Sequence, residues 1–571
     1  MYIETVPNRN SPPAILLRES YRKDGKVVKR TLANLTKWPG HIVEGLRHLL
    51  KGTPLVSPDT LFEIKASTPH GHVAAVLGTI RRLALDKTIS SASCRKRDLV
   101  LAMISERLLH PCSKLATTRL WHTTTLAEEL GVGDADENEL YEAMDWLLER
   151  KDRIEDALAR HHLEDGAMVL YDISSSYYEG STCSLARYGH NRDKKEGRRI
   201  IVYGLLTDEH GCPVAVDVYP GNTGDPTTVA DQVEKIRGRF GLKNVILVGD
   251  RGMLTQTNID KIKEAPGMGW ITALRSAAIR KLLSEGTLQL SLFDKQNLAE
   301  IRSPDFPGER LVACFNPLLQ QDRRRTREEL IEATQKNLLR VSKEIARHTK
   351  NPLSDKDIGL RVGKVINAYK VAKHFRVHIK EGALTWELVQ TSIDAEAQLD
   401  GIYVIRTNES AERLSGEDAV RNYKRLTQVE FAFRSLKSLD LLVRPIRHRV
   451  EDRVRAHIFI CMLAYYIQWH MRQDLKELLF DDEELGEDRS SRDPVKPATP
   501  SLSAAVKKKN KQNRNGMKVH SFTTLIADLG TLCRNRCRTK NNPDAPGFSI
   551  LTNVTQMQEK ALKLLGVYPV R

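Results

Sequence analysis

Residues 168–172 (Met-Val-Leu-Tyr-Asp) and residues 245–250 (Val-Ile-Leu-Val-Gly-Asp) decide the fold of this chain. Each is a short, continuous apolar run that ends in an aspartate, and such runs are typical of strands buried on both faces of a sheet. Between them lie two further strand-like runs, over residues 199–206 and 213–218, and a helical pattern over residues 227–240. Strand, hairpin, hairpin, helix and strand in this order predict an α/β unit.

The hydrophobic period changes along the chain and divides it into regions. The α/β pattern pauses after residue 265 and resumes with a strand-like run over residues 401–408, followed by helical patterns over residues 416–439 and 451–471. The expected regions are 1–90 (N-terminal, β-containing), 91–164 (helical and DNA-binding), 165–265 with 401–475 (the split α/β core), 266–400 (an insertion domain) and 476–571 (a linker and helical tail). We expect an α/β fold with a mixed sheet and flanking helices, interrupted by the insertion and preceded by an α+β region. The strand order is that of ribonuclease-H-like sheets.

The amino-acid composition limits the classes of function that the protein can have. The 571 residues carry 89 Lys and Arg against 73 Asp and Glu, a net charge of +16, and 40% of them are hydrophobic. The hydrophobic fraction is too high for a disordered chain. The net positive charge favours a polyanionic binding partner. No apolar run is long enough to predict a membrane span, and the first residues do not resemble a secretory signal. Of eight cysteines only Cys533 and Cys537 are close, in a C-x3-C spacing without further ligands nearby, which favours reduced thiols over zinc.

Asp172 and Asp250 are the first candidates for chemistry, because each follows a predicted buried strand. One such aspartate is commonly a turn former or helix cap. Two in one α/β unit can hold Mg²⁺ through oxygen ligands, and two ions about 4 Å apart can clamp the attacking and leaving oxygens of a phosphodiester displacement.

The helix expected around residues 423–439 offers a third acid. At 3.6 residues per turn its side chains separate into two groups. The apolar stripe consists of Leu426, Val429, Phe433 and Leu436, and the polar arc of Tyr423, Glu430, Arg434 and Lys437. Glu430 is then either a third metal ligand, with Arg434 and Lys437 meeting phosphate oxygens, or half of an exposed ion pair of little consequence.

Several of these segments resemble insertion-sequence DDE transposases. They are Asp172 within residues 170–174, Pro-Gly-Asn-Thr-Gly-Asp at residues 220–225, and Asp250 within residues 248–253. The stretch 423–437 resembles the YREK signature of the IS-four-like branch, which has a long insertion before its last acid. Tyr423, Glu430 and Lys437 match that signature, but its arginine slot holds Leu426. Because Arg425 points away from Glu430 by the helical angles, we expect Arg434 to supply the missing cation.

The resemblance covers residues 165–475 and implies a ribonuclease-H-like catalytic core in which Asp172, Asp250 and Glu430 hold two Mg²⁺ (or Mn²⁺) ions. It implies an endonuclease and strand-transfer reaction, in which water and then the freed 3′-hydroxyl attack phosphodiesters. The implied partner is double-stranded DNA, both the inverted repeats of transposon ends and the target, bound by a homodimer in a bacterial cytoplasm, at the nucleoid and not at a membrane. The residues expected to contact DNA are Tyr423, Arg434, Lys437, Arg251, Arg192, Lys194, Arg447 and Arg449.

Other readings stay open for some residues. Glu451 and Asp452 compete for the place of the third ligand, although acids at a helix start explain them better. The basic stretches around Arg192 and Arg447 either bind phosphate or are solvated. Residues 114–122 either belong to a helix-turn-helix or form a solvated face. A serine nucleophile at residues 174–176 is improbable without a Gly-x-Ser-x-Gly motif.

Two other functions remain as alternatives: a transposase-derived DNA-binding protein without catalysis, and a metal-dependent nuclease of the same fold. Residues 1–164 are expected to bind transposon ends as an isolated fragment, because their helices and cations precede the catalytic core.

Overall fold

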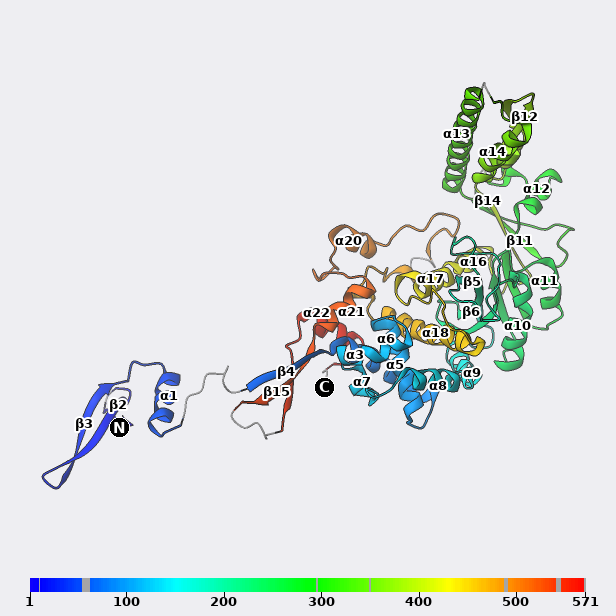
Figure 1. Cartoon of the computed structure of the whole chain (residues 1–571). Coiled ribbons are helices and arrows are strands. Elements are labelled where there is room, and N and C mark those ends of the chain that lie inside the picture. The colour runs from blue at the N-terminus through cyan, green and yellow to red at the C-terminus, as the bar shows by residue number, and fades with distance from the viewer. Residues whose placement is uncertain are drawn as a thin grey trace. The chain divides into compact units, whose positions relative to one another are not determined.

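The computed structural model describes residues 1–9, 11–53, 62–293, 296–348, 351–486, 491–540 and 546–568. The chain forms two compact units (Figure 1). The first combines residues 1–69 with residues 532–553, and the second combines residues 70–531 with residues 554–571.

The first unit contains two small antiparallel sheets. One has the order β1-β2-β3, from β1 (Tyr2–Val6), β2 (Ala14–Lys23) and β3 (Lys26–Asn34), and is followed by helix α1 (Gly40–Leu50). The turn between β2 and β3 holds Asp24 and Gly25, both at positive φ, as a two-residue hairpin requires. The other sheet has the order β16-β15-β4, from β4 (Phe62–Pro69), β15 (Cys533–Thr539) and β16 (Phe548–Leu551). The region 476–571, expected to be a linker and a helical tail, therefore also contains the strands β15 and β16, and β15 pairs with β4 near the other end of the chain.

The second unit is built on an eight-stranded mixed sheet of order β10-β11-β14-β9-β8-β5-β6-β7. Its strands are β5 (Met168–Tyr177), β6 (Ile200–Asp208), β7 (Pro213–Pro220), β8 (Val245–Gly249), β9 (Met268–Ala273), β10 (Leu298–Ile301), β11 (Arg310–Phe315) and β14 (Ile402–Thr407). Strand β8 runs parallel to β5 and β9, and the other neighbours are antiparallel. The run β7-β6-β5-β8-β9 is a three-stranded meander followed by two parallel strands, which is the ribonuclease-H-like arrangement expected from the sequence.

The apolar runs form the centre of this sheet. Every residue of β6 and of β8 is buried, as continuous hydrophobic runs predict for strands covered on both faces. Tyr171 and Trp270 are the largest side chains of the surrounding core, and both are fully buried. Strands β9, β10 and β11 come from residues 266–400, so this region extends the sheet as well as interrupting its sequence.

Helices cover the sheet, and two of them carry candidate site residues. The covering helices are α9 (Lys151–His162), α10 (Val229–Glu234), α11 (Gln256–Lys263), α16 (Gly416–Lys424), α17 (Leu426–Arg434) and α18 (Glu451–Asp474). Helix α16 carries Tyr423 and α17 carries Glu430. Helix α18 is buried along most of its length and packs against β7, while α17 packs against β5. Among the described residues, no helix combines the length and the apolar character that crossing a membrane requires.

The sequence predicted one continuous helix over residues 416–439, but the structure has two helices, α16 and α17, followed by a π turn. Arg425 separates α16 from α17, since the Arg425 N–H bonds the Asn422 carbonyl and the Gln428 N–H bonds the Arg425 carbonyl, each three residues back. These bonds tighten the turn and interrupt the α-helical ladder. Residues 435–439 then form a wider π turn, in which the Asp440 N–H bonds the Ser435 carbonyl.

The helical pattern expected before the core is confirmed. Its helices within residues 91–164 are α5 (Arg95–Leu109), α6 (Lys114–Arg119), α7 (Leu126–Leu130) and α8 (Glu137–Leu148), followed by α9. Helices α3 (Gly71–Arg82) and α4 (Leu85–Ile89) lie earlier, in the region 1–90 that was expected to contain β-strands. Because α5 and α8 both pack against α18, these helices share a core with residues more than 300 positions later. An isolated fragment 1–164 would expose that apolar surface, so its expected independent DNA binding stays a prediction.

The remaining elements lie in the insertion and the tail. Helices α13 (Pro317–Arg347) and α14 (Asp355–Ala368) share a small apolar core with the hairpin of β12 (Phe375–Lys380) and β13 (Ala383–Leu388). Figure 1 shows α13, α14 and β12 grouped together. The others are α12 (Ser276–Ser284), α15 (Gln390–Ala397), α20 (Leu502–Asn510), α21 (Phe522–Gly530) and α22 (Gln556–Leu564).

Candidate catalytic site

Asp172 and Asp250 lie side by side on neighbouring strands. In the parallel pair β5–β8, Tyr171 is opposite Gly249, and each aspartate is the next residue along the chain. Asp250 follows the last residue of β8, as the sequence predicted. The expected strand end at Asp172 is wrong, because β5 continues to Tyr177 through its pairing with β6.

The Asp172 carboxyl is half-buried, and its Oδ1 accepts the Ile173 N–H at 2.8 Å. Burial raises the pKa of Asp172 to about 7; the Ile173 N–H and the charge of Arg192 oppose this rise, and the charges of Asp250 and Glu430 add to it. Asp172 is therefore close enough to Asp250 and to Glu430 for their charges to act on it, although the three acids come from three separate segments. A cation bound between these acids would offset the effect of the two charges on Asp172.

Asp250 is exposed and held at both oxygens. Its Oδ2 accepts the Gly252 N–H at 3.2 Å, and its Oδ1 accepts the Tyr423 hydroxyl at 3.2 Å. Burial, and then the charge of Asp250, raise the pKa of Tyr423, so the phenol stays neutral and can donate this bond. Tyr423 on α16 thereby links the helical segment to the strand that carries Asp250.

Glu430 is exposed on α17, and the opposite face of that helix anchors it on the sheet. The predicted apolar stripe is confirmed: Leu426, Val429, Phe433 and Leu436 are all buried. The ring of Phe433 meets that of Tyr203 on β6 edge to face, at 5.8 Å between centroids. Ordinary amphipathic packing therefore directs Glu430 away from the core.

Lys437, which was expected to meet phosphate, is largely buried and already has an anionic partner. Its Nζ lies 3.2 Å from Asp193 Oδ1, and Arg444 contacts the same oxygen. Asp193 also accepts the Tyr177 N–H at 3.0 Å, which ties the segment after β5 to the π turn. Burial lowers the pKa of Lys437, and Asp193 opposes this. Sequence reasoning missed Asp193, although an acid within the basic stretch 190–199 was a visible signal.

The two arginines of this helical segment differ from each other in their surroundings. Arg434 is exposed, one turn after Glu430. Arg425, expected on an open face, is half-buried and forms an ion pair with Glu209 in the turn between β6 and β7. That pair fixes the junction of α16 and α17 against the sheet, which the helical angles alone did not reveal.

Of the other cations expected to bind DNA, two form ion pairs with acids of this chain and three are exposed to solvent. Arg192 donates two hydrogen bonds to Asp225, at 2.6 and 2.7 Å, and so joins the basic loop to the segment 220–225. Arg447 is exposed and bonds Glu179 at 3.1 Å. Lys194, Arg251 and Arg449 are exposed. Their contacts with DNA stay predictions.

Glu451 begins α18, as the preferred interpretation predicted. It accepts the Ser184 hydroxyl and the Arg455 guanidinium, both at 2.6 Å, and these bonds lower its pKa. Asp452 is an exposed acid in the same first turn.

Comparison with known families decides the assignment. Residues 176–467, more than half of the chain, match the transposase DDE domain. The chain belongs to the DDE transposase family. Residues 3–55, which contain β1 to β3 and α1, also match the N-terminal domain of IS1634 family transposases. Asp250 and Glu430 of this transposase fall inside the DDE match, whereas Asp172 lies four residues before its first residue. The more specific YREK branch stays a prediction.

Similarity beyond the family models is distant. No curated protein matches the transposase. One solved structure, the piggyBac transposase synaptic complex with hairpin DNA studied by cryo-EM, matches with a TM-score of 0.34 and 9% identity, over 81% of this chain and 76% of that chain. A likeness at this level adds nothing to the assignment, which depends on the family models. As a DDE transposase the protein binds DNA, cleaves it and transfers strands, with divalent metal ions as the family's general cofactor.

Proposed function

We propose that Asp172, Asp250 and Glu430 are the catalytic acids of this transposase and that they hold two Mg²⁺ ions, for which Mn²⁺ can substitute. The observation that carries the proposal is the convergence of three carboxylates from two adjacent strands and helix α17, where the charges of Asp250 and Glu430 add to the burial that raises the pKa of Asp172 to about 7. Carboxylate oxygens that are partly open to solvent fit these hard cations. Bound there, the ions would supply Lewis acidity and an activated water for phosphodiester attack.

The protein's own residues set the geometry of that attack. The rigid strands β5 and β8 hold Asp172 and Asp250 in register, and the Tyr423 hydroxyl restrains one oxygen of Asp250. Glu430 approaches from α17, where the buried stripe fixes the helix. Arg434, exposed one turn later, is the cation proposed to meet the scissile phosphate through charge-assisted hydrogen bonds.

The reaction then needs no covalent enzyme intermediate. A water oxygen attacks phosphorus at the transposon end, the P–O3′ bond breaks, and the leaving 3′-oxygen takes up a proton. The freed 3′-hydroxyl attacks a target phosphodiester in the same manner, so that one P–O bond forms as another breaks. The proposed substrates are the terminal inverted repeats and duplex target DNA, bound by a homodimer.

The test is replacement of each acid in the full chain by its neutral isostere, Asp172→Asn, Asp250→Asn and Glu430→Gln. Cleavage of a labelled end duplex in Mg²⁺ should fall at least a hundredfold in each variant, while gel-shift binding of the same duplex stays within a few-fold. Asp452→Asn, which alters the rival acid in the first turn of α18, is the matched control and should cleave normally. Full cleavage by any one of the three variants would remove that residue from the site.

A strand-transfer assay separates transposition from simple hydrolysis. Supplying pre-cleaved ends with a free 3′-hydroxyl and a supercoiled target should yield joined products with the unmodified protein. Cleavage without any joined product would instead support a nuclease, and end binding without cleavage a DNA-binding protein without catalysis.

A further inference from the structure

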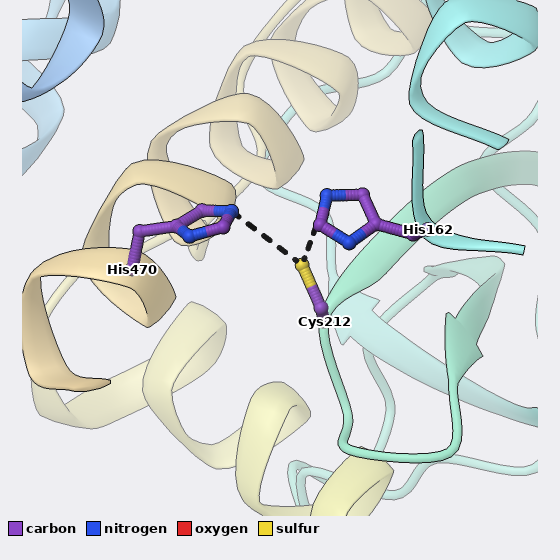
Figure 2. Close-up of side chains that lie close together, drawn as sticks. All are labelled: His162, Cys212 and His470. Atoms are coloured by element: carbon purple, nitrogen blue, oxygen red, sulfur yellow. Dashed lines mark hydrogen bonds between the residues drawn. The ribbon is translucent and has the colours of Figure 1, made fainter. Parts of the chain in front are cut away.

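A cluster of metal-ligating side chains lies outside the group of acids. Figure 2 shows His162, Cys212 and His470 turned toward one another from three elements. His162 is the last residue of α9, Cys212 lies in the turn between β6 and β7, and His470 is near the end of α18. The sulfur of Cys212 is 3.8 Å from His162 Nε2 and 4.0 Å from His470 Nε2, and the ligand atoms all lie within 4.8 Å of one another.

We propose that these three residues bind one Zn²⁺ ion, at a site distinct from the catalytic acids. A tetrahedral zinc ion, with Zn–S near 2.3 Å and Zn–N near 2.0 Å, sets its ligand atoms about 3.6 Å (S to N) and about 3.3 Å (N to N) apart. The observed separations exceed these by a few tenths of an ångström to about 1.5 Å, which small side-chain rotations cover. Thiolate sulfur and imidazole nitrogen favour zinc over the magnesium that suits carboxylates.

The register of the sheet separates this cluster from the acids. On β6, Leu205 pairs with Asp172, whereas Asp208 pairs with Val169, three residues nearer the beginning of β5. The turn that carries Cys212 therefore leaves the sheet about 10 Å from Asp172, in the direction away from Asp250.

The surroundings of His162 match those of a zinc-bound imidazole. While its Nε2 faces the sulfur, its Nδ1 lies 3.9 Å from Asp208 Oδ2. The other oxygen of Asp208 accepts the His210 and Cys212 N–H groups at 2.8 Å each, so this carboxylate is fixed in place. A carboxylate behind a ligating histidine is the usual outer partner of a metal site. The Tyr466 hydroxyl, 3.0 Å from His162 Nε2, is a present hydrogen-bond partner of that nitrogen, and a bound cation would replace it there.

The protonation states allow binding. Burial lowers the pKa of His162 to about 4 and that of His470 to about 3, so both rings are neutral at pH 7 and each has one nitrogen lone pair that can bind a cation. Burial raises the pKa of the Cys212 thiol, and Asp208 adds to this. Zinc binding therefore replaces the thiol proton: the S–H bond breaks, an S–Zn bond forms, and one proton goes to solvent.

Hydrogen bonding alone explains the cluster less well. Sulfur is a weak donor and acceptor, and the thiol has a single proton to share between two imidazole nitrogens at 3.8 and 4.0 Å. One thiol and two imidazoles that converge from three elements are satisfied together by one cation.

The bound ion would also brace the helix that carries Glu430. The turn holding Cys212 contains Glu209, the partner of Arg425, and Gly211, where a Cβ would lie 2.7 Å from the Gln428 side chain. Gln428 is two residues before Glu430, so fixing the turn fixes the surface on which α17 lies. This consequence depends on the proposed function, whereas the zinc site itself does not.

The experiment uses the full-length protein, stripped with a chelator and titrated with Co²⁺ as a spectroscopic probe. We expect one equivalent to produce a thiolate-to-cobalt charge-transfer band in the near ultraviolet, which Zn²⁺ then abolishes. Cys212→Ser should lose the band. Cys314→Ser, which alters a buried thiol on β11, should retain it, and so should Asp172→Asn. Asp208→Asn should weaken Co²⁺ binding 10- to 100-fold.

The absence of a thiolate band in the wild-type protein would overturn the proposal, as would a band that persists in Cys212→Ser. Far-ultraviolet circular dichroism checks that the variants fold. If Cys212→Ser does not fold, His470→Gln must weaken Co²⁺ binding at least tenfold, and unchanged affinity in that variant would refute the site. Loss of catalysis in Asp172→Asn with the band intact would leave the zinc site supported, so the two proposals fail independently.

Discussion

Asp172→Asn is expected to stabilise the metal-free transposase at pH 8 while it abolishes cleavage. The pKa of Asp172 rises from 3.8 to about 7 on folding, so between these values the unfolded chain has lost a proton that the folded chain retains. Stability therefore falls as the pH rises from about 4 to 7 and is then constant. Three pH units at about 1.4 kcal/mol each give about 4 kcal/mol as an upper figure. Because the side chain still touches solvent, we expect about 2 kcal/mol.

Asparagine removes the charge but keeps the oxygen that accepts the Ile173 N–H. Denaturant unfolding of chelator-treated protein at pH 5 and pH 8 measures the effect: the advantage of Asp172→Asn over the wild type should grow between these two values. Asp452→Asn, in the exposed first turn of α18, is the control and should show a pH-independent difference. Adding Mg²⁺ at pH 8 should stabilise the wild type more than the variant. If Asp172→Asn is less stable than the wild type at pH 8 without metal, burial and the neighbouring acids do not raise the pKa of Asp172 as we infer.

The helical segment 416–439 allows three more tests. Arg434→Ala should reduce end cleavage about tenfold or more through a lost phosphate contact, whereas Arg425→Ala should mainly lower the melting temperature, because its ion pair fixes the helix junction; the reverse pattern in cleavage rates would contradict our assignment of the two arginines. Leu426→Ala should lower the free energy of unfolding by about 2–5 kcal/mol, as measured by denaturant titration. Tyr423→Phe removes the hydroxyl that restrains Asp250 and should slow cleavage by about tenfold, and an unchanged cleavage rate would show that this bond does not position the carboxylate.

Much of the secondary structure of the core could be predicted from local patterns in the sequence. The buried runs before Asp172 and Asp250 predicted two neighbouring strands, and the spacing of Leu426, Val429 and Phe433 predicted which face of α17 is buried. These inferences succeed because strand and helix periods depend on residues a few positions apart. The same locality explains the errors: the break at Arg425 and the full length of β5 depend on what each segment packs against.

Tertiary structure alone decided which charged and metal-ligating groups meet. Lys437 is paired with Asp193, Arg425 with Glu209, and β15 with β4, each across more than 200 residues of sequence. His162, Cys212 and His470 carry no spacing signature, because each comes from a different element and only the packing of α9, the β6–β7 turn and α18 brings them together. A sequence pattern records the preference of a segment for a strand or a helix and for a buried face. The partner of a polar side chain depends on sheet register and helix packing, which the whole chain determines at once.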